Sequence, residues 1–540
     1  MEETNMHQTP STVVDQWTGP YLAVDGQPFL IVGAEVHNSS SSTLEAIASS
    51  FATIKLLGAN TVLAPVAWDL FESEEGKFDY TLIDAMIATA HEFGLRLIPL
   101  WFGSWKNAAS TYAPHWVKKD VMRFPRAELA DGRRIEHVSP FSSEAKAADS
   151  RAFAALMQRL SDTDHEGTVL MVQVENEVGL LGASRDHSPA AQAAFEGRVP
   201  AAVIEAVSAD SGIPVHQNWQ ENGSRTEGTW KEVFGEGDRV DEAFMAAAYA
   251  SYVDAVASAG AQNHRVPLFV NAWLDADSVL DGPVPLAGGK RPGEYPSGGP
   301  VAPVAPIWDS LAPALDFLAP DMYVDDAEPV FSAFSARKGR LFIPELRADT
   351  VGIAQMFSAV GGHRALGVSP FGVDDMDPDA DSSTGLKDAY YLLSAAAAII
   401  RTNPEARMQG FVLNDETPSA SFQFGETALQ INTQSDWSPA LPTYPAYGLV
   451  IEDGDGAFVI GRGFWVTPFA GEGAPVSFLS AAEYRLEAGE LIVTRRINGD
   501  ETASGTLVPF PFVGTPPMSD RAIPTKLPEA GIVRFSLYTY

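Results

Sequence analysis

The sequence predicts a (β/α)₈ barrel over residues 1–404, followed by a smaller all-β, sandwich-like domain over residues 405–540. In the first part, short buried apolar runs alternate with segments of helical periodicity, a pattern typical of a parallel sheet covered by helices. In the second part, strand-like runs are separated by turns such as Asp453-Gly454 and Asn498-Gly499. A length of 540 residues fits one barrel with insertions and one smaller domain.

The first barrel strand is expected just after an apparent hairpin. Apolar residues alternate over 21–36 and lead into the buried run 29–32, which we predict to be strand one. A capping box at Ser42 and Glu45 then predicts the start of a helix, and Gly58 predicts its end. The order is the one expected for the first β/α unit of a barrel.

Seven further buried runs provide the remaining strands. They cover residues 60–63, 95–100, 169–174, 267–270, 317–323, 341–343 and 366–369. With the first run they number eight, which favours a closed barrel. A segment rich in proline and glycine, 275–306, predicts a long loop over the carboxyl ends of the strands, and 386–400 predicts the last helix.

Composition limits the classes of partner. The formal net charge of −34 would repel a phosphate backbone, so nucleic acid is not an expected partner, whereas a neutral sugar is tolerated. The chain has no long apolar run for a membrane and no cysteine for disulfide or thiolate chemistry.

Residues 1–17 are polar and acidic and lack the features of a secretory signal, which predicts a cytoplasmic protein. The oligomeric state stays open, with a homo-oligomer among the alternatives.

Two glutamates end predicted barrel strands. The apolar run 169–174 ends in Glu175-Asn176-Glu177, and a second run ends in Pro344-Glu345. The carboxyl ends of barrel strands converge on one site, so these two carboxyls can be held about 5 Å apart. That separation suits a pair in which one carboxylate attacks an anomeric carbon and the other protonates the departing oxygen. Either motif alone is more often a solvated strand end.

Several motifs resemble the family-35 glycoside hydrolases, in particular a compact bacterial β-galactosidase branch, over about residues 19–400. They are Glu175-Asn-Glu177-Val-Gly179, Gly58-Ala-Asn-Thr-Val62 through Trp68, Glu72 and Gly76-Lys-Phe-Asp79, Pro344-Glu345, 229–234, 241–245, 270–273, 295–299 and 319–323. The resemblance implies a retaining exo-β-galactosidase that acts on terminal non-reducing β-D-galactosides.

The same resemblance implies roles for individual residues. Glu177 would be the general acid/base and Glu345 the nucleophile, with Asn176 on the sugar 2-hydroxyl and Glu175 in support. Tyr323 would orient Glu345 by a hydrogen bond. Glu177 must keep its proton near neutral pH while Glu345 stays ionised, and Tyr323 or Arg347 is expected to favour that asymmetry.

The remaining predicted substrate contacts lie near strand ends. They are His37, Trp68, Trp101, Trp105, Lys106, Asn107, Trp273 and Asp374. The tryptophan rings offer flat apolar faces for sugar C–H surfaces, although each ring alone is more often part of a core. Lys106 and Asn107 stand where many family members carry a Cys-Ala-Glu-Trp type motif, and both side chains can donate hydrogen bonds to hydroxyls.

Other chemistries lack their motifs. No Gly-x-Gly-x-x-Gly sequence, no phosphate-binding loop and no His-Glu-x-x-His is present, so no cofactor and no metal is expected. The acidic run 374–381 lacks the glycine and terminal glutamate of a calcium-binding loop.

Two alternatives remain open. The first is a retaining β-glycosidase of another specificity, for a β-glucoside, β-fucoside or β-arabinoside, because the segment after strand three departs from the family pattern. The second is a carbohydrate-binding protein that has kept the barrel without catalysis.

Overall fold

The computed structural model describes residues 11–16, 19–276, 289–433, 445–471, 474–513 and 526–540. Most of the acidic N-terminal segment and residues 277–288 of the predicted long loop lie outside this part of the chain. Among the described helices, none has both the length and the apolar character needed to cross a membrane.

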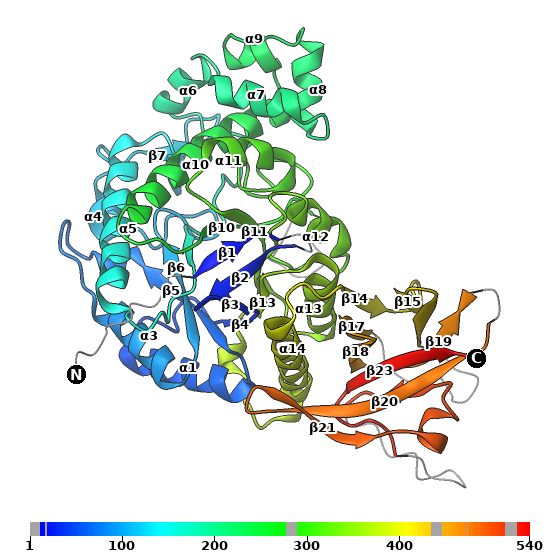
Figure 1. The fold of residues 1–540 in the computed structure, drawn as a ribbon. Coiled ribbons are helices and arrows are strands. Elements are labelled where there is room, and N and C mark those ends of the chain that lie inside the picture. The colour runs from blue at the N-terminus through cyan, green and yellow to red at the C-terminus, as the bar shows by residue number, and fades with distance from the viewer. Residues whose placement is uncertain (1–10, 17–18, 277–288, 434–444, 472–473, 514–525) are drawn as a thin grey trace.

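Eight parallel strands form the barrel, as predicted (Figure 1). They are β4 (Ile31–Glu35), β5 (Thr61–Ala67), β6 (Arg96–Phe102), β9 (Val172–Val174), β10 (Leu268–Ala272), β11 (Phe317–Pro320), β12 (Ile343–Leu346) and β13 (Gly367–Pro370). The pairing order is β11-β10-β9-β6-β5-β4-β13-β12. A parallel bridge between Met322 and Leu346 joins the two ends of this order and closes the sheet.

Helices surround the barrel. They are α1 (Leu44–Leu57), α2 (Trp68–Phe71), α3 (Thr81–Glu92), α4 (His115–Lys119), α5 (Ser143–Thr163), α10 (Asp238–Ala261), α11 (Ala305–Leu311), α12 (Glu328–Ser335), α13 (Thr350–His363) and α14 (Thr384–Thr402). Four more helices form a layer at the top of the view in Figure 1. They are α6 (Pro189–Phe195), α7 (Ala201–Ala209), α8 (Pro214–Glu221) and α9 (Trp230–Phe234).

The start of the barrel differs from the prediction in two details. The hairpin forms, but its strands β2 (Tyr21–Val24) and β3 (Gln27–Phe29) join β1 (Thr12–Val14) in a separate antiparallel sheet. The predicted capping box at Ser42 and Glu45 is wrong. Thr43 is the N-cap of α1 and accepts from the Ala46 N–H, because Ser42 instead donates to the Ser39 carbonyl in the preceding turn.

Side chains inside the barrel divide it into an apolar floor and a polar top. In β4, Ile31 belongs to the interior cluster, whereas Val32 and Ala34 pack outward against the helices. Leu22 and Val24 of the N-terminal hairpin belong to the same interior cluster as Ile31. Polar side chains gather where the strands end, and the candidate site lies there.

Two antiparallel sheets form the C-terminal part. One contains β14 (Met408–Leu413), β17 (Ala446–Asp453), β18 (Gly456–Arg462), β23 (Ile532–Thr539), β20 (Val476–Glu487) and β21 (Glu490–Arg496) in that order. The other contains β15 (Ser419–Phe424), β16 (Thr427–Asn432), β19 (Phe464–Ala470) and β22 (Val508–Phe510). One apolar core joins the two sheets, while α13 and α14 contact the six-stranded sheet from the barrel side. A hairpin of β7 (Arg126–Glu128) and β8 (Arg134–Val138) completes the described strands.

Candidate active site

The two predicted glutamates meet at the carboxyl end of the barrel. Glu177 follows β9, Glu345 lies in β12, and both side chains are buried. Carboxyl oxygens of Glu177, Glu345 and Asp321 all lie within 4.8 Å of one another. The chain after β9 bends sharply, with left-handed φ values of 63° at Glu175 and 44° at Glu177. The Glu177 N–H donates to Asn271 Oδ1 at 2.9 Å, which fixes the bend.

Glu345 is surrounded by hydrogen-bond donors and positive charge. The Tyr323 hydroxyl donates to its Oε2 at 3.0 Å. Its Oε1 accepts from the side-chain amides of Asn176 and Asn271, each at 3.4 Å. The Lys106 ammonium lies 3.7 Å from the same oxygen. All four groups favour the ionised carboxylate.

The surroundings of Glu177 favour the protonated carboxyl instead of the ionised one. Burial, and then the negative charge of Glu345, raise the pKa of Glu177 to about 7, against the charge of Lys106. Glu177 therefore keeps its proton up to about neutral pH, while Glu345 has the surroundings of a carboxylate. Asp321 is held by Asn271 Nδ2 at 2.8 Å, and burial together with the neighbouring carboxylates raises its pKa well above the ordinary range.

Lys106 is held in place by buried carboxyl groups. Glu175 accepts from the Ser104 and Trp105 N–H groups at 3.2 and 2.9 Å, so it fixes the segment that carries Lys106. Burial lowers the pKa of Lys106, but the charges of Glu345 and Glu177 outweigh that effect and leave the pKa raised. Lys106 is a permanent cation in the site.

The structure does not bring every predicted contact to the carboxyl groups. His37 and Asp374 pair with each other after β4 and β13, with 2.8 Å between His37 Nδ1 and Asp374 Oδ1. Asn107 is exposed. The ring of Trp273, which follows β10, is partly exposed, and its Nε1 has no acceptor among the described residues.

The other three tryptophans lie in the core instead. Trp68, Trp101 and Trp105 are fully buried. Their ring N–H groups donate to Glu72, to Asp149 and to the Val138 carbonyl, respectively, at 2.8–3.0 Å. Alternation along β6 turns Trp101 away from the barrel interior, and Trp68, the first residue of α2, packs beside it with 6.3 Å between the ring centres.

Arg347 does not reach Glu345. It pairs with Asp349 and Asp325, both outside the carboxyl cluster, and Lys106 supplies the positive charge expected from it. Three site residues were not predicted, namely Asn271, Asp321 and Glu35. Asn271 and Asp321 lie in segments that resemble the family, and both stand near the end of a predicted strand. That position could have identified them as site residues.

The three-carboxyl cluster has a spacing that could hold a metal ion. Its donor set fits one poorly. The pKa values of Glu177 and Asp321 are raised, so both carboxyls favour the neutral form, and the Lys106 ammonium already provides a cation beside Glu345.

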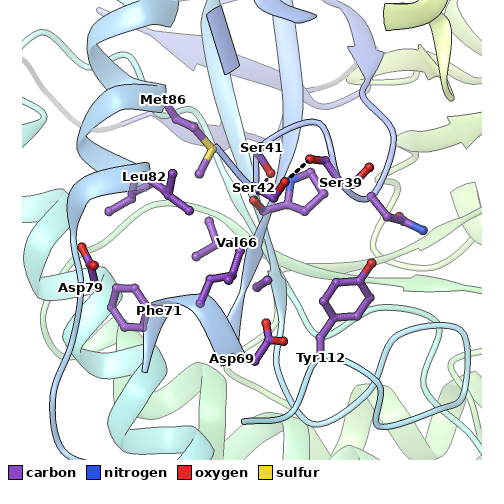
Figure 2. A pocket seen from close by; sticks show the side chains of 15 residues that line it. Ser39, Ser41, Ser42, Val66, Asp69, Phe71, Asp79, Leu82, Met86 and Tyr112 are labelled. Carbon is purple, nitrogen blue, oxygen red and sulfur yellow. Dashed lines mark hydrogen bonds between the residues drawn. The ribbon is translucent and has the colours of Figure 1, made fainter. Parts of the chain in front are cut away.

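A separate cavity of about 280 Å³ lies at the same end of the barrel, between the segment after β4, the end of β5, and α3. Figure 2 shows Leu82 and Met86 on one side and Asp69 and Tyr112 on the other. Its lining does not include Glu177 or Glu345. It is therefore a neighbour of the carboxyl cluster and not the cluster's own pocket.

A known family matches the first part of the barrel. Residues 21–271, which include Glu177, match the family model described as glycosyl hydrolases family 35. The model match and the curated relatives support glycoside hydrolase family 35 for residues 21–271. A second model, described as a domain of unknown function (DUF5597), matches residues 386–509, from α14 into the C-terminal sheets.

Curated relatives match part of this chain. Beta-galactosidase-1-like protein 3 of Homo sapiens is 29% identical over 179 residues, or 32% of this chain and 25% of that protein. Beta-galactosidase 8 of Oryza sativa subsp. japonica is 28% identical over 172 residues, or 30% of this chain and 23% of that protein. The matches thus span about a quarter of the relatives' own lengths. A solved β-galactosidase from the psychrophilic Marinomonas ef1 is 13% identical, with coverage of 69% and 60% and a TM-score of 0.47.

Proposed function

We propose that this protein is a retaining exo-β-galactosidase that hydrolyses terminal non-reducing β-D-galactosides by double displacement. The observation that carries the proposal is the short separation of Glu177 and Glu345, whose carboxyl oxygens lie within 4.8 Å. Carboxyl groups of retaining glycosidases stand roughly 5 Å apart, whereas inverting enzymes need about 6.5–9.5 Å to admit a water molecule.

In the first step, a Glu345 oxygen forms a bond to the anomeric carbon as the bond from that carbon to the glycosidic oxygen breaks. Glu177 gives its proton to the departing oxygen. Tyr323 holds the Glu345 carboxyl by a hydrogen bond, and the Lys106 ammonium lies beside its other oxygen, so both orient it for the attack. The raised pKa of Glu177, about 7, supplies an acid at neutral pH.

In the second step, Glu177 acts as a base. Once Glu345 is bonded to the sugar it carries no negative charge, so one cause of the raised pKa of Glu177 disappears. The ionised Glu177 takes a proton from water, and the resulting hydroxide attacks the anomeric carbon. The bond from that carbon to Glu345 breaks, and both carboxyls return to their starting states.

The sugar is proposed from the names of the relatives, two of which are called β-galactosidases or β-galactosidase-like. A panel of 4-nitrophenyl β-D-galactoside, β-D-glucoside, β-D-fucoside and α-L-arabinopyranoside measures this directly. We expect the highest kcat/KM on the galactoside. Dominant turnover of the glucoside would assign the second specificity, and binding of galactose without turnover of any glycoside would indicate a carbohydrate-binding protein.

The two roles can be separated with azide. Glu345→Gly should lose at least 10³-fold in kcat, and added azide should restore turnover by attacking from the vacated face, giving α-galactosyl azide. Glu177→Gly is the matched control. With an activated aryl substrate it still forms the glycosyl-enzyme, which azide should attack from the other face to give β-galactosyl azide. The same anomer from both variants would contradict the assignment.

A further inference from the structure

Glu35 is the last residue of β4, and its side chain points into the barrel. Strand residues alternate between two faces, and Ile31, four residues earlier, belongs to the interior cluster. Gly33, between them, faces Ser369, since a Cβ added to Gly33 would lie 2.1 Å from Ser369 Oγ. The backbone carbonyl of Glu35 accepts from the Gly372 N–H at 2.8 Å, which fixes the strand end. The carboxyl of Glu35 therefore lies at the polar top of the barrel.

This carboxyl accepts no hydrogen bond within the part of the chain that the structure describes. Glu35 is 0% exposed, and neither carboxyl oxygen has a hydrogen-bond donor among the described residues. Other buried carboxyls of the chain are bonded: Glu483, for example, accepts from Arg495 Nε at 2.6 Å and from the Ala530 N–H at 2.9 Å. A buried polar group with no partner destabilises the folded state, so it is retained where it serves a ligand.

The surroundings of Glu35 are those of the active site. The charges that act on it come from Glu345, Lys106 and Glu177. Burial, and then the charge of Glu345, raise its pKa well above the ordinary range, which favours the protonated, neutral carboxyl. A neutral carboxyl offers one O–H donor and a carbonyl acceptor side by side. Two neighbouring hydroxyl groups of a sugar match that pair.

Strand order decides which hydroxyls these are. Going round the barrel, β4 lies three strands from β9, which leads to Glu177, and two strands from β12, which carries Glu345. In a pyranose whose anomeric carbon lies between Glu177 and Glu345, C4 is the ring carbon opposite C1 and lies on the side away from these two carboxyls. Intervening strands separate β4 from both β9 and β12, so a carboxyl at the end of β4 would meet that side of the ring.

We propose that Glu35 binds the hydroxyl groups at C3 and C4 of the glycone and is the residue that distinguishes the configuration at C4. The inference rests on the proposed function for the position of the anomeric carbon. No group of the described residues takes the place of these hydroxyls, so a sugar that lacks the 4-hydroxyl, or turns it away, leaves part of the buried carboxyl unbonded.

The test uses Glu35→Met with three aryl β-glycosides: the galactoside, its 4-deoxy analogue and its 6-deoxy analogue. On the galactoside we expect kcat/KM to fall at least 10²-fold, because the thioether offers no donor and only a weak acceptor. The 6-deoxy substrate should suffer the same loss. The 4-deoxy substrate should lose at least 5-fold less than the galactoside, since only the contact of its 3-hydroxyl with position 35 is removed. Equal losses on all three would overturn the proposal.

Thermal stability separates a ligand-binding role of Glu35 from a structural role, because the two roles predict changes of Tm in opposite directions. Glu35→Met should raise Tm, because it replaces an unbonded buried carboxyl by an apolar side chain of similar length. The matched control is Glu483→Gln, which removes a bonded buried carboxyl far from the site and should lower Tm while kcat/KM is kept. A fall of Tm in Glu35→Met would overturn the proposal.

Failure of the proposed function can be told apart from failure of this inference. If the wild-type protein hydrolyses none of the glycosides, titration calorimetry with methyl β-D-galactoside replaces kinetics. Glu35→Met should then weaken binding of the galactoside at least 10-fold, and it should weaken binding of the 4-deoxy analogue less. Unchanged galactoside binding would overturn the inference whether or not the protein is catalytic.

Discussion

Lys106 is a buried cation between two carboxyl groups of different character. Its ammonium lies 3.7 Å from Glu345 and 4.9 Å from the centre of the Phe102 ring, and its side chain is almost completely buried. Its charge favours the ionised form of Glu345 and lowers the pKa of Glu177. Lys106 thereby sets the balance between nucleophile and acid.

Lys106→Met should shift the pH dependence of catalysis. Hydrolysis requires protonated Glu177, so kcat/KM falls as pH rises through the Glu177 pKa of about 7. Lys106 lowers that pKa, so without it the pKa rises and the basic limb of the profile moves to higher pH. We also expect kcat to fall at least 10-fold, since Glu345 loses its charge partner.

A pH profile of kcat/KM on an aryl β-galactoside measures both effects. Lys231→Met is a suitable control, because Lys231 pairs with Glu236 at the surface and should leave the profile unchanged. A basic limb that stays in place or moves to lower pH in Lys106→Met would contradict the electrostatic role.

The sequence was enough to predict those site residues that differ sharply in polarity from their neighbours in the chain. Glu177 and Glu345 end long apolar runs, and Tyr323, Asn176 and Lys106 were found with the help of the family resemblance. Glu35 and Asp321 were missed. Each is a single acidic residue at a strand end, and whether it faces the interior depends on where its strand begins, which an apolar run does not define to one residue.

At the scale of elements, the uncertainty about where a strand begins also explains why predicted and observed strand bounds differ. The run 341–343 predicted a strand, whereas β12 covers Ile343–Leu346. Apolar runs mark the part of a strand that fills the barrel floor, but hydrogen bonding continues into the polar top. In the C-terminal part, β20 does not alternate strictly between buried and exposed residues, and its Leu479 is 61% exposed, so it lacks a simple strand pattern.

The helix α14 connects the barrel with the C-terminal sheets. Its Asp388 accepts two hydrogen bonds from Arg462 of β18, at 2.9 and 2.7 Å, and both side chains are largely buried. Removing one member of a buried pair leaves the other charge without compensation, which costs about 3–5 kcal/mol. Removing one member of this pair should therefore cost much more stability than removing one member of an ion pair at the surface.

Arg462→Met should therefore lower the free energy of unfolding by about 3 kcal/mol, while kcat/KM at 25 °C stays unchanged because no site residue contacts the pair. Urea denaturation measures the first quantity. The matched control is Arg407→Met, which removes an exposed pair with Glu452 in the same sheet and should cost less than about 1 kcal/mol. Equal losses in the two variants would contradict the argument.

At the scale of the whole molecule, barrel and sheets share their packing. One apolar cluster contains interior-facing residues of α13 and α14 together with Tyr447, Leu449 and Ile460 of the six-stranded sheet. The predicted boundary between residues 404 and 405 falls in the connection between α14 and β14. The change from α/β to β texture was visible in the sequence, but the shared core was not, since periodicity does not say which faces meet.

The bend after β9 has a consequence for protein engineering. Glu177 holds φ at 44°, a conformation that costs a non-glycine residue about 1–3 kcal/mol and that glycine adopts freely. A library randomised at position 177 and sorted for folded yield should therefore become enriched in glycine, which sequencing of the sorted pool will reveal; enrichment in glutamate would contradict this. At this position a screen for expression discards the very side chain that a screen for turnover must keep.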